Sequence, residues 1–325
     1  MRQHYAPLLF SLILSMNFLQ EEAYGQQDAH IALYKYHLQL INPAFIGTQG
    51  AAYLNTTYRS QWAGIEDAPQ IQAISLGIPS SEKRLNYGVL FYNDRTFIEQ
   101  QTRFFANFSY RIPLNQDLNL FLGLSAGGEN FSVNFGSLEN VSPLGDQFLE
   151  SFSKFNPNMG VGIYLQGGNF YAALSTPKLF QTKRFREDDG FSTTATDLVH
   201  LYGSLGSRIP MSTDWFWVNS ANFRYVARAP WSVITNTGVG YKNHEITVGY
   251  QWDASFSGTL MIQASDALSF GYSYQFSNSK AIASLTSGNH EFLLKIRLSK
   301  SNDPTEILEE PETEAEEKTT STSNK

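Results

Sequence analysis

The sequence contains no cysteine, little charge and no excess of basic residues. With 0 Cys among 325 residues, a thiolate metal site, a disulfide framework and a cysteine nucleophile are excluded. Asp, Glu, Lys and Arg together make up 16% of the chain, well below the roughly 25% of an average soluble domain. The 23 basic residues are outnumbered by 30 acidic residues, so we expect no nucleic-acid partner.

A hydrophobic run long enough to form a transmembrane helix is also missing. The most apolar stretch, Pro7–Leu19, is too short to cross about 30 Å of hydrocarbon. It follows the basic Arg2 and precedes the small-x-small sequence Ala23-Tyr24-Gly25, an arrangement typical of a cleaved secretory signal peptide. We predict a signal peptide over residues 1–25 and a mature chain starting near Gln26. A membrane protein with this sequence would have to be a β-barrel.

Aromatic residues and glycine are abundant in a chain of modest hydropathy. Phe, Trp and Tyr make up 14% of the residues, glycine occurs 24 times, and the mean hydropathy is −0.27. This composition is typical of a transmembrane β-barrel, whose lipid face is apolar and whose lumen face is polar. A soluble all-β domain is the alternative, but it would usually carry more charge.

Apolar and polar residues alternate with period two between residues 51 and 299, which predicts fourteen strands. In Leu268–Phe276, for example, aromatic residues alternate with Ser, Gly and Gln. The predicted strands are Ala51–Tyr58, Gln70–Ile78, Tyr87–Asn93, Arg103–Ile112, Asn119–Phe131, Asn158–Gln166, Phe170–Ser175, Val199–Arg208, Trp215–Ala227, Trp231–Lys242, Glu245–Asp253, Thr259–Ala264, Leu268–Phe276 and Glu291–Ser299.

The predicted connections alternate between short turns and longer loops. The longest loops are predicted over residues 132–157, 176–198 and 277–290. An outer-membrane barrel has short periplasmic turns and long outer loops. We therefore predict an all-β fold, an antiparallel up-and-down transmembrane barrel of about 14 strands over residues 51–300. The predicted location is the outer membrane, in contact with its lipid and with both termini periplasmic.

Four tryptophans fall at the ends of predicted strands. Trp215 and Trp217 open a strand at the inferred periplasmic rim, whereas Trp231 and Trp252 lie at the inferred outer rim. Because amphipathic rings favour both membrane interfaces, we predict that these four residues are interface aromatics. Tryptophans of an ordinary core are the alternative.

Two segments flank the predicted barrel. The pre-barrel segment, residues 26–50, contains the apolar stretch Ile31–Ile46, which we expect to pack in or under the barrel mouth as a plug. Residues 301–325 form an acidic tail, with eight acidic and two basic residues from Asp303 to Lys325. Its composition predicts a disordered periplasmic tail. The tail is either solvated or docked on a basic partner.

No arrangement of residues points to catalysis. The five histidines of the predicted mature chain are not spaced like a metal pair on one element. The sequence has neither a Gly-x-Ser-x-Gly elbow nor a phosphate-binding loop. We predict a protein that is not an enzyme and that has no cofactor and no metal site.

Two blocks of residues stand out from the strand pattern. The first block comprises a turn and a polar cluster at the end of the first strand, and the second block is the start of the last strand. The members are Asn42, Pro43, Ala44 and Gly47, then Tyr58, Arg59, Gln61, Trp62, Ala68 and Pro69, and finally His290 and Glu291. On these residues the chain resembles the PorP/SprF family of type IX secretion and gliding-motility outer-membrane proteins of Bacteroidota. The chain departs from the family at Phe45, where Tyr is common, and in its acidic tail.

The resemblance implies an outer-membrane barrel that works with type IX secretion components. It further implies support for the surface delivery or anchoring of an exported, adhesin-like partner through that partner's C-terminal sorting domain. A small-molecule channel, porin-like or like a fatty-acid transporter, is the alternative, since that transporter type also carries an N-terminal hatch.

Arg59 and Asn42-Pro43-Ala44 each allow a structural and a recognition role. We expect Arg59 to point into the lumen and to pair with Glu66 or Asp67, because its planar guanidinium can hold a carboxylate with two hydrogen bonds. A solvated rim arginine is the alternative. For Asn42-Pro43-Ala44 we expect a turn that leads into the first strand, with partner docking as the alternative.

Overall fold

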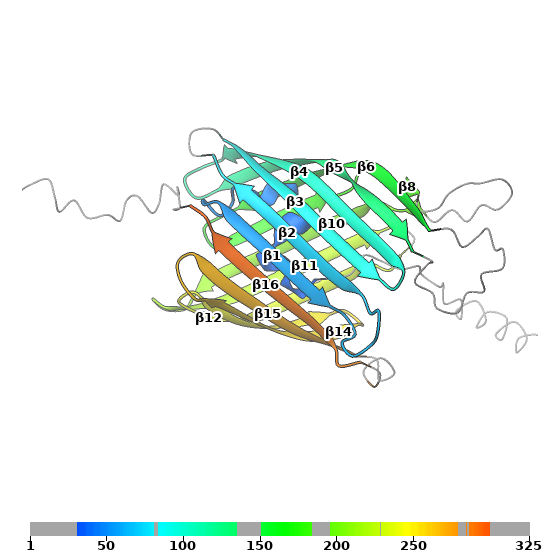
Figure 1. The fold of residues 1–325 in the computed structure, drawn as a ribbon. Helices are drawn as coiled ribbons and strands as arrows, with labels where there is room; N and C mark the ends of the chain where they lie inside the picture. The colour runs from blue at the N-terminus through cyan, green and yellow to red at the C-terminus, as the bar shows by residue number, and fades with distance from the viewer. Residues whose placement is uncertain are drawn as a thin grey trace, which may run out of the picture.

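A closed antiparallel barrel of fourteen strands forms the body of the protein (Figure 1). The computed structural model describes residues 31–80, 84–134, 151–183, 196–227, 229–278, 284 and 286–299. The barrel strands are β1 (Tyr53–Ser60), β2 (Gln70–Ile78), β3 (Leu85–Thr96), β4 (Glu99–Pro113), β5 (Asn119–Val133), β6 (Phe152–Gln166), β7 (Phe170–Thr176), β10 (His200–Pro210), β11 (Trp215–Val226), β12 (Ser232–Tyr241), β13 (His244–Gln251), β14 (Ser255–Gln263), β15 (Leu268–Ser277) and β16 (Asn289–Arg297). Pairing of β1 with β16 closes the barrel.

Each of the fourteen predicted strands corresponds to one barrel strand, so the predicted fold class is confirmed. The largest error is at β6, which begins at Phe152 instead of Asn158 and contains Pro157. Only Val161–Gln166 of β6 pairs with β7, so Pro157 lies where the strand has a ladder on one side only, a place where proline is tolerated. The prediction also missed β8 (Thr182–Lys183) and β9 (Thr196–Asp197), which form a separate small sheet.

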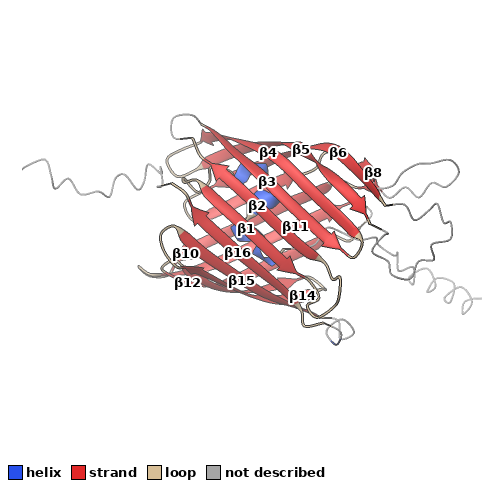
Figure 2. Cartoon of the chain, viewed as in Figure 1, coloured by secondary structure: helices blue, strands red, loops and turns tan. Residues whose placement is uncertain are grey.

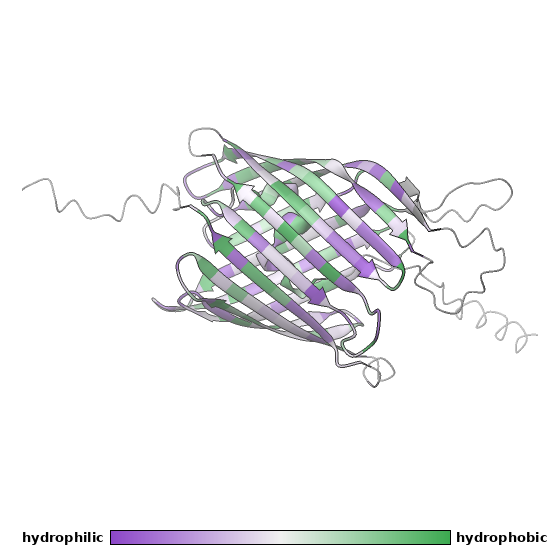
Figure 3. Cartoon of the chain, viewed as in Figure 1, coloured by the Kyte–Doolittle hydropathy of each residue, from purple (hydrophilic) through white to green (hydrophobic). Residues whose placement is uncertain are grey.

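Hydrophobic and hydrophilic residues alternate along the strands (Figure 3). The apolar members point outward, as the exposed side chains of Ile246, Val248, Phe270, Phe276 and Phe292 show. Their neighbours on the inner face include the buried polar residues Thr247, Gln275 and Glu291, whereas Leu293 is a buried apolar residue there. A wall that is apolar outside and polar inside is the arrangement of a transmembrane barrel. No helix among the described residues has the length and apolar character needed to cross a membrane.

The two ends of the barrel differ. One end, called the turn end here, carries the connections 79–84, 114–118, 167–169, 211–214, 242–243 and 264–267, and β16 finishes there. The opposite end, called the loop end, carries 61–69, 97–98, 134–151, 177–199, 227–231, 252–254 and 278–288. Much of the three long loops predicted over 132–157, 176–198 and 277–290 lies outside the described residues, as do the predicted signal peptide and acidic tail.

The first described segment, residues 31–46, lies inside the barrel (Figure 2). It folds into three short 3₁₀ helices, η2 (Ala32–Tyr36), η3 (Leu38–Leu40) and η4 (Pro43–Phe45). η2 contacts β14, β15 and β16, η3 contacts β2 and β3, and η4 contacts β4, β5 and β6. Nearly every side chain from Ile31 to Ile46 is buried. This segment is called the plug below.

Candidate functional site

The barrel closure brings the two sequence motifs together. In the antiparallel register of β1 and β16, Arg59 lies opposite Glu291 and Ser60 lies opposite His290. These positions are more than 200 residues apart in the chain, yet they occupy one place on the wall near the loop end. The end of the first strand and the start of the last strand, two places that carried the family resemblance, therefore lie side by side.

Arg59 and Glu291 form a buried ion pair that also holds the plug. The Arg59 side chain is 4% exposed and that of Glu291 is 0% exposed, and the Arg59 guanidinium donates to Glu291 Oε1. The two carboxylate oxygens of Glu291 also accept the backbone N–H groups of Ala32 and Leu33, at 2.9 and 3.0 Å. The first N–H groups of a helix have no partner within the helix, and η2 has no side-chain cap of its own. Glu291 therefore caps η2 from the wall, and we call the Arg59–Glu291 unit the latch.

The latch continues into a network of amides on neighbouring strands. Gln275 Oε1 accepts from both Arg59 Nη atoms, at 3.2 and 3.1 Å, and from Asn289 Nδ2 at 3.1 Å. Gln275 Nε2 donates to Ser255 Oγ at 2.6 Å and to Gln251 Oε1 at 3.1 Å. These contacts fix the Gln275 amide, so Arg59 meets a second oriented acceptor beside Glu291.

The predicted partner of Arg59 was wrong. Arg59 faces the lumen as expected, but it pairs with Glu291 and not with Glu66 or Asp67. Asp67 lies 3.7 Å from Arg95 in an exposed pair. The reason is the strand register: Arg59 and Glu291 point inward from directly paired positions, whereas Asp67 belongs to the 61–69 connection outside the lumen wall.

The remaining members of the first motif organise the 61–69 connection. The Gln61 N–H donates to the carbonyl of Pro69, which follows Ala68, at 2.9 Å. This hydrogen bond joins the two ends of the connection. The Trp62 N–H donates to Asn289 Oδ1 at 2.9 Å, and Trp62 has a positive φ of 52°. The connection is thereby tied to the start of β16, beside the latch.

Tyr58 and His290 face outward, on the opposite side of the wall from the latch. His290 Nδ1 lies 2.9 Å from the hydroxyl of Tyr272. Tyr58 lines a shallow outer groove with Tyr272 and Phe292. These two motif residues therefore belong to the lipid-facing surface and do not contact the plug.

The Asn42-Pro43-Ala44 turn sits on a floor of small residues. The Asn42 side chain accepts the Ala44 N–H at 2.9 Å and donates to the Ile163 carbonyl at 3.1 Å. Gly123 and Gly162 lie opposite each other on β5 and β6. A Cβ on Gly123 would lie 2.1 Å from the Ala44 nitrogen, and one on Gly162 would lie 2.0 Å from Asn42 Oδ1. Only glycine at these two positions lets the turn approach the wall.

Gly47 marks the end of the plug near the turn end. It has a φ of +87°, which side-chain-bearing residues rarely adopt. A Cβ on Gly47 would lie 2.3 Å from Asn86 Cγ. One residue further on, the Thr48 carbonyl accepts from Gln166 Nε2 at 3.1 Å. The plug thus extends from the latch, near the loop end, to the turn end.

His37 joins the middle of the plug to the wall. Its side chain is fully buried, with Nδ1 2.7 Å from Thr57 Oγ1 and Nε2 2.6 Å from Ser75 Oγ. Burial, reinforced by the charge of Lys295, lowers the pKa of the His37 imidazole from 6.5 to about 3. A neutral imidazole supplies one donor and one acceptor, which matches the two hydroxyl partners.

A second buried charged cluster lies further along the wall. Glu129 Oε2 accepts from Gln101 Nε2 at 2.8 Å and lies 3.4 Å from Lys178 Nζ and from Arg103 Nε. Glu129 and Lys178 are 1% and 3% exposed. The sequence prediction missed this cluster because Lys178 lies in a predicted loop and gives no periodic signal.

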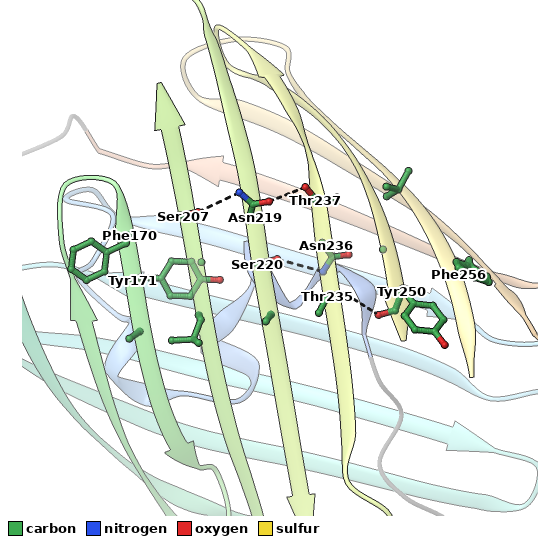
Figure 4. A pocket seen from close by; sticks show the side chains of 16 residues that line it. Phe170, Tyr171, Ser207, Asn219, Ser220, Thr235, Asn236, Thr237, Tyr250 and Phe256 are labelled. Atoms are coloured by element: carbon green, nitrogen blue, oxygen red, sulfur yellow. Dashed lines mark hydrogen bonds between the residues drawn. The ribbon is translucent and has the colours of Figure 1, made fainter. Parts of the chain in front are cut away.

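The outer wall carries a groove across β7 and β10–β14 (Figure 4). Its volume is about 700 Å³, and its lining includes the exposed side chains of Leu205, Val248 and Phe256. A polar row crosses it: Thr237 Oγ1 donates to Asn219 Oδ1 at 2.8 Å, and Asn219 Nδ2 lies 3.5 Å from Ser207 Oγ. The row satisfies its own hydrogen bonds, which suits a lipid-facing wall.

Four exposed tryptophans mark two levels of the outer surface. Trp215 and Trp217 lie at the turn end of β11, whereas Trp231 immediately precedes β12 and Trp252 immediately follows β13, both at the loop end. Trp217 Nε1 donates to Thr237 Oγ1 at 2.9 Å. This is the two-level placement of aromatic residues at membrane interfaces.

The site is suited to holding a segment in place. Among the described residues, no group of three or more His, Asp or Glu side chains is placed to bind a metal ion. The charged and polar side chains of the latch are engaged in fixing the plug. Gly123 and Gly162, called the glycine floor here, could have been predicted from the sequence. They alternate with predicted outward residues such as Leu122 and Ile163 and therefore fall on the inward face.

Three solved structures illustrate what the chain is similar to. The Ralstonia pickettii toluene transporter TbuX gives a TM-score of 0.49 at 8% identity, covering 79% of this chain and 92% of that chain. The monoaromatic hydrocarbon channel CymD gives 0.47 at 12% identity, covering 84% and 93%. The Acinetobacter baumannii outer membrane protein Omp33 gives 0.41 at 11% identity, covering 77% and 100%.

A search of curated proteins gave no match, whereas the comparison with family models identifies the family. The family model described as type IX secretion system membrane protein PorP/SprF matches residues 23–296. This range includes the plug, the latch and nearly all of the barrel. The chain therefore belongs to the PorP/SprF family of type IX secretion system membrane proteins, and it is an outer-membrane β-barrel.

Proposed function

We propose that this protein is an accessory of type IX secretion that binds an exported partner and supports its delivery to, or anchoring at, the cell surface. The partner would be adhesin-like and recognised through its C-terminal sorting domain. The proposal also assigns the protein no catalytic activity. Family membership supports the link to type IX secretion, and the partner is our inference.

The filled lumen is the observation that carries the proposal. The plug is buried along its length and is fixed at several places, among them Glu291, the hydroxyls of Thr57 and Ser75, and the Gly123–Gly162 floor. An open diffusion channel gains nothing from so many fixed contacts across its lumen. A protein whose task is recognition at the membrane surface requires only that the barrel be a rigid support.

The plug and the loop end are tied together, which offers a route for recognition. The latch lies beside the 61–69 connection, and the backbone of Ala63 hydrogen-bonds to Gly288 and Ser287 at 2.9 Å each. A partner bound over these connections would lie next to Arg59 and Glu291. We propose that the loop end is the recognition face.

The test is deletion of the gene followed by proteomics of the cell surface. We expect the loss of one large exported protein, restored by the wild-type gene. An unchanged surface proteome would overturn the proposal. Complementation with a gene lacking residues 28–41 separates two roles of the plug: a folded barrel that fails to restore export makes the plug part of recognition.

A small-molecule channel is the competing function, and purified protein decides it. Planar-bilayer conductance and solute uptake into vesicles are measured on the wild-type protein. We expect neither ion conductance nor solute flux while the plug is in place. Reproducible solute flux through the wild-type barrel would favour the channel.

A further inference from the structure

Four cations converge on the lumen at the turn end, and we call them the basic mouth: Lys35, Arg208, Lys295 and Arg297. Lys295 and Arg297 occupy alternate inward positions at the end of β16, opposite Asn55 and Tyr53 of β1. The Arg208 guanidinium lies 3.6 Å from the centre of the Phe216 ring. Lys35 extends from η2 toward β13. Arg208 Nη2 also donates to the Lys242 carbonyl in the 242–243 turn at 3.0 Å, and Lys295 Nζ lies 4.3 Å from the centre of the Tyr53 ring.

One described acid faces this cluster. Glu245 Oε2 lies 2.5 Å from Lys35 Nζ and accepts the Tyr36 hydroxyl at 2.8 Å. Among the described residues, no carboxylate lies within 4.0 Å of the charged groups of Arg208, Lys295 or Arg297. Four positive charges therefore face one negative charge.

Other charges at this end cancel. The remaining described bases are Arg84, Arg111 and Lys242, and the remaining described acids are Asp117, Asp214 and Asp266, all at the turn ends of strands or in the turns. The excess positive charge thus resides in the basic mouth. Charges of one sign in a concave, low-dielectric setting focus a field that attracts an oppositely charged ligand.

We propose that the acidic segment Asp303–Lys325 of this same chain docks on the basic mouth. With eight acids and two bases, its side chains carry a net charge of −6. The segment starts where it is needed, because β16 ends at Arg297 at this mouth and the Leu298 N–H donates to the Ala52 carbonyl at 2.7 Å. Five residues separate Arg297 from Asp303.

The geometry allows this docking without strain. Fourteen strands about 4.8 Å apart and tilted by roughly 40° give a barrel radius of roughly 14 Å. A chain advances by up to about 3.3–3.6 Å per residue, so the segment reaches every part of the mouth. Tethering keeps its acids at an effective concentration on the order of millimolar, so that even weak charge pairing suffices.

Site-directed spin labelling tests this proposal. Because the chain has no cysteine, two introduced cysteines are the only labelling sites. The full-length chain carries Ala315→Cys in the acidic segment and Asn243→Cys in the 242–243 turn, each with a nitroxide label. The distribution of distances between the labels is measured by pulsed electron resonance. Ala254→Cys at the loop end replaces Asn243→Cys as the positional control.

We expect a short, narrow distance to residue 243 at low ionic strength and long distances to residue 254. The short population should fall several-fold in about 1 M salt, where the Debye length is about 3 Å. The matched control replaces the acids by Asp303→Asn and by Glu→Gln at residues 306, 309, 310, 312, 314, 316 and 317. It leaves the barrel unchanged and should abolish the short population. An identical distribution for the neutralised and wild-type segments would overturn the proposal.

Discussion

Arg59 and Glu291 face each other across the seam that closes the barrel, and Glu291 accepts both the Arg59 guanidinium and the first N–H groups of η2. One carboxylate thus takes part in two structural events, the pairing of the first strand with the last and the seating of the plug. The barrel can pair its seam by backbone bonds alone, but among the described residues Glu291 is the one hydrogen-bond acceptor for these two N–H groups. The latch couples closure of the wall to occupation of the lumen.

Breaking the latch should destabilise the whole protein. Arg59→Ala leaves the buried carboxylate of Glu291 without its cation, and removal of one partner of a buried pair costs about 3–5 kcal/mol. We expect a lower temperature for the heat-induced mobility shift of the barrel in SDS gels. Arg95→Ala, which breaks the exposed pair with Asp67, is the matched control and should cost at most about 1 kcal/mol. Equal, small effects of the two substitutions would contradict a structural role for the latch.

A double substitution should separate the two tasks of the latch. Arg59→Met with Glu291→Leu removes both charges, and apolar replacement of a whole buried ion pair is often close to neutral. Barrel stability should therefore recover most of the loss seen in either single variant. The Ala32 and Leu33 N–H groups still lack an acceptor, at about 1–3 kcal/mol for each buried group. Hydrogen exchange of residues 31–46 should be faster than in the wild-type protein, and slow exchange there would show that Glu291 does not hold the plug.

The glycine floor should be intolerant of side chains. In Gly123→Val the new Cβ would lie 2.1 Å from a backbone atom of the plug, which cannot move aside as a flexible side chain can. We expect η4 to be displaced, with protease cleavage between residues 42 and 50 while the barrel stays folded. Gly258→Ala is the control, because nothing lies within 4 Å of the added Cβ. Protection of this stretch in Gly123→Val would mean that the wall can yield.

The strands were predictable because the barrel repeats one local rule. Each strand alternates between lipid and lumen, so period-two patterning sets both its position and its inward face. Leu268–Phe276 and Gln70–Ile78 were placed to within a residue or better. Errors occurred at Phe152–Pro157, where a strand extends past its neighbour and the usual exclusion of proline does not apply.

The latch could not be derived from the sequence because its partners are distant in the chain. Glu66 and Asp67 were the carboxylates nearest to Arg59 in sequence, whereas Glu291 becomes a neighbour only when the last strand pairs with the first. Register across a closure depends on strand count and stagger together, and neither is fixed by any one segment. The inward direction of Arg59 was predicted correctly, and it fits the alternation of β1, since Thr57, two residues earlier, is also buried.

The seating of the plug should depend on pH through His37. His37 lies in the plug, outside the membrane-spanning strands, and burial lowers the pKa of its imidazole to about 3. This folded-state pKa lies below the ordinary value of 6.5. The stabilisation of the seated plug by the neutral His37 imidazole is therefore complete above about pH 6.5, and it is lost progressively as pH falls toward 3. Hydrogen exchange of residues 31–46 should accelerate over that window. His37→Gln should flatten the profile, whereas His290→Gln, on the outward face, should leave it unchanged, and a flat wild-type profile would contradict the assignment.

Removing the first part of the plug should open the lumen. Deletion of residues 28–41 takes away η2 and η3, which cover the inner faces of β14–β16 and of β2 and β3, but leaves η4 on its glycine floor. A barrel of fourteen strands without a filling segment is wide enough for an aqueous path. In planar bilayers the shortened protein should therefore give stable, porin-like conductance steps, whereas the wild-type protein should stay closed. Deletion of residues 303–325 is the matched control, because it leaves the plug intact and should not open the path. Equal conductance of the wild-type and shortened barrels would mean that the plug does not seal the lumen, and it would return the channel function to first place.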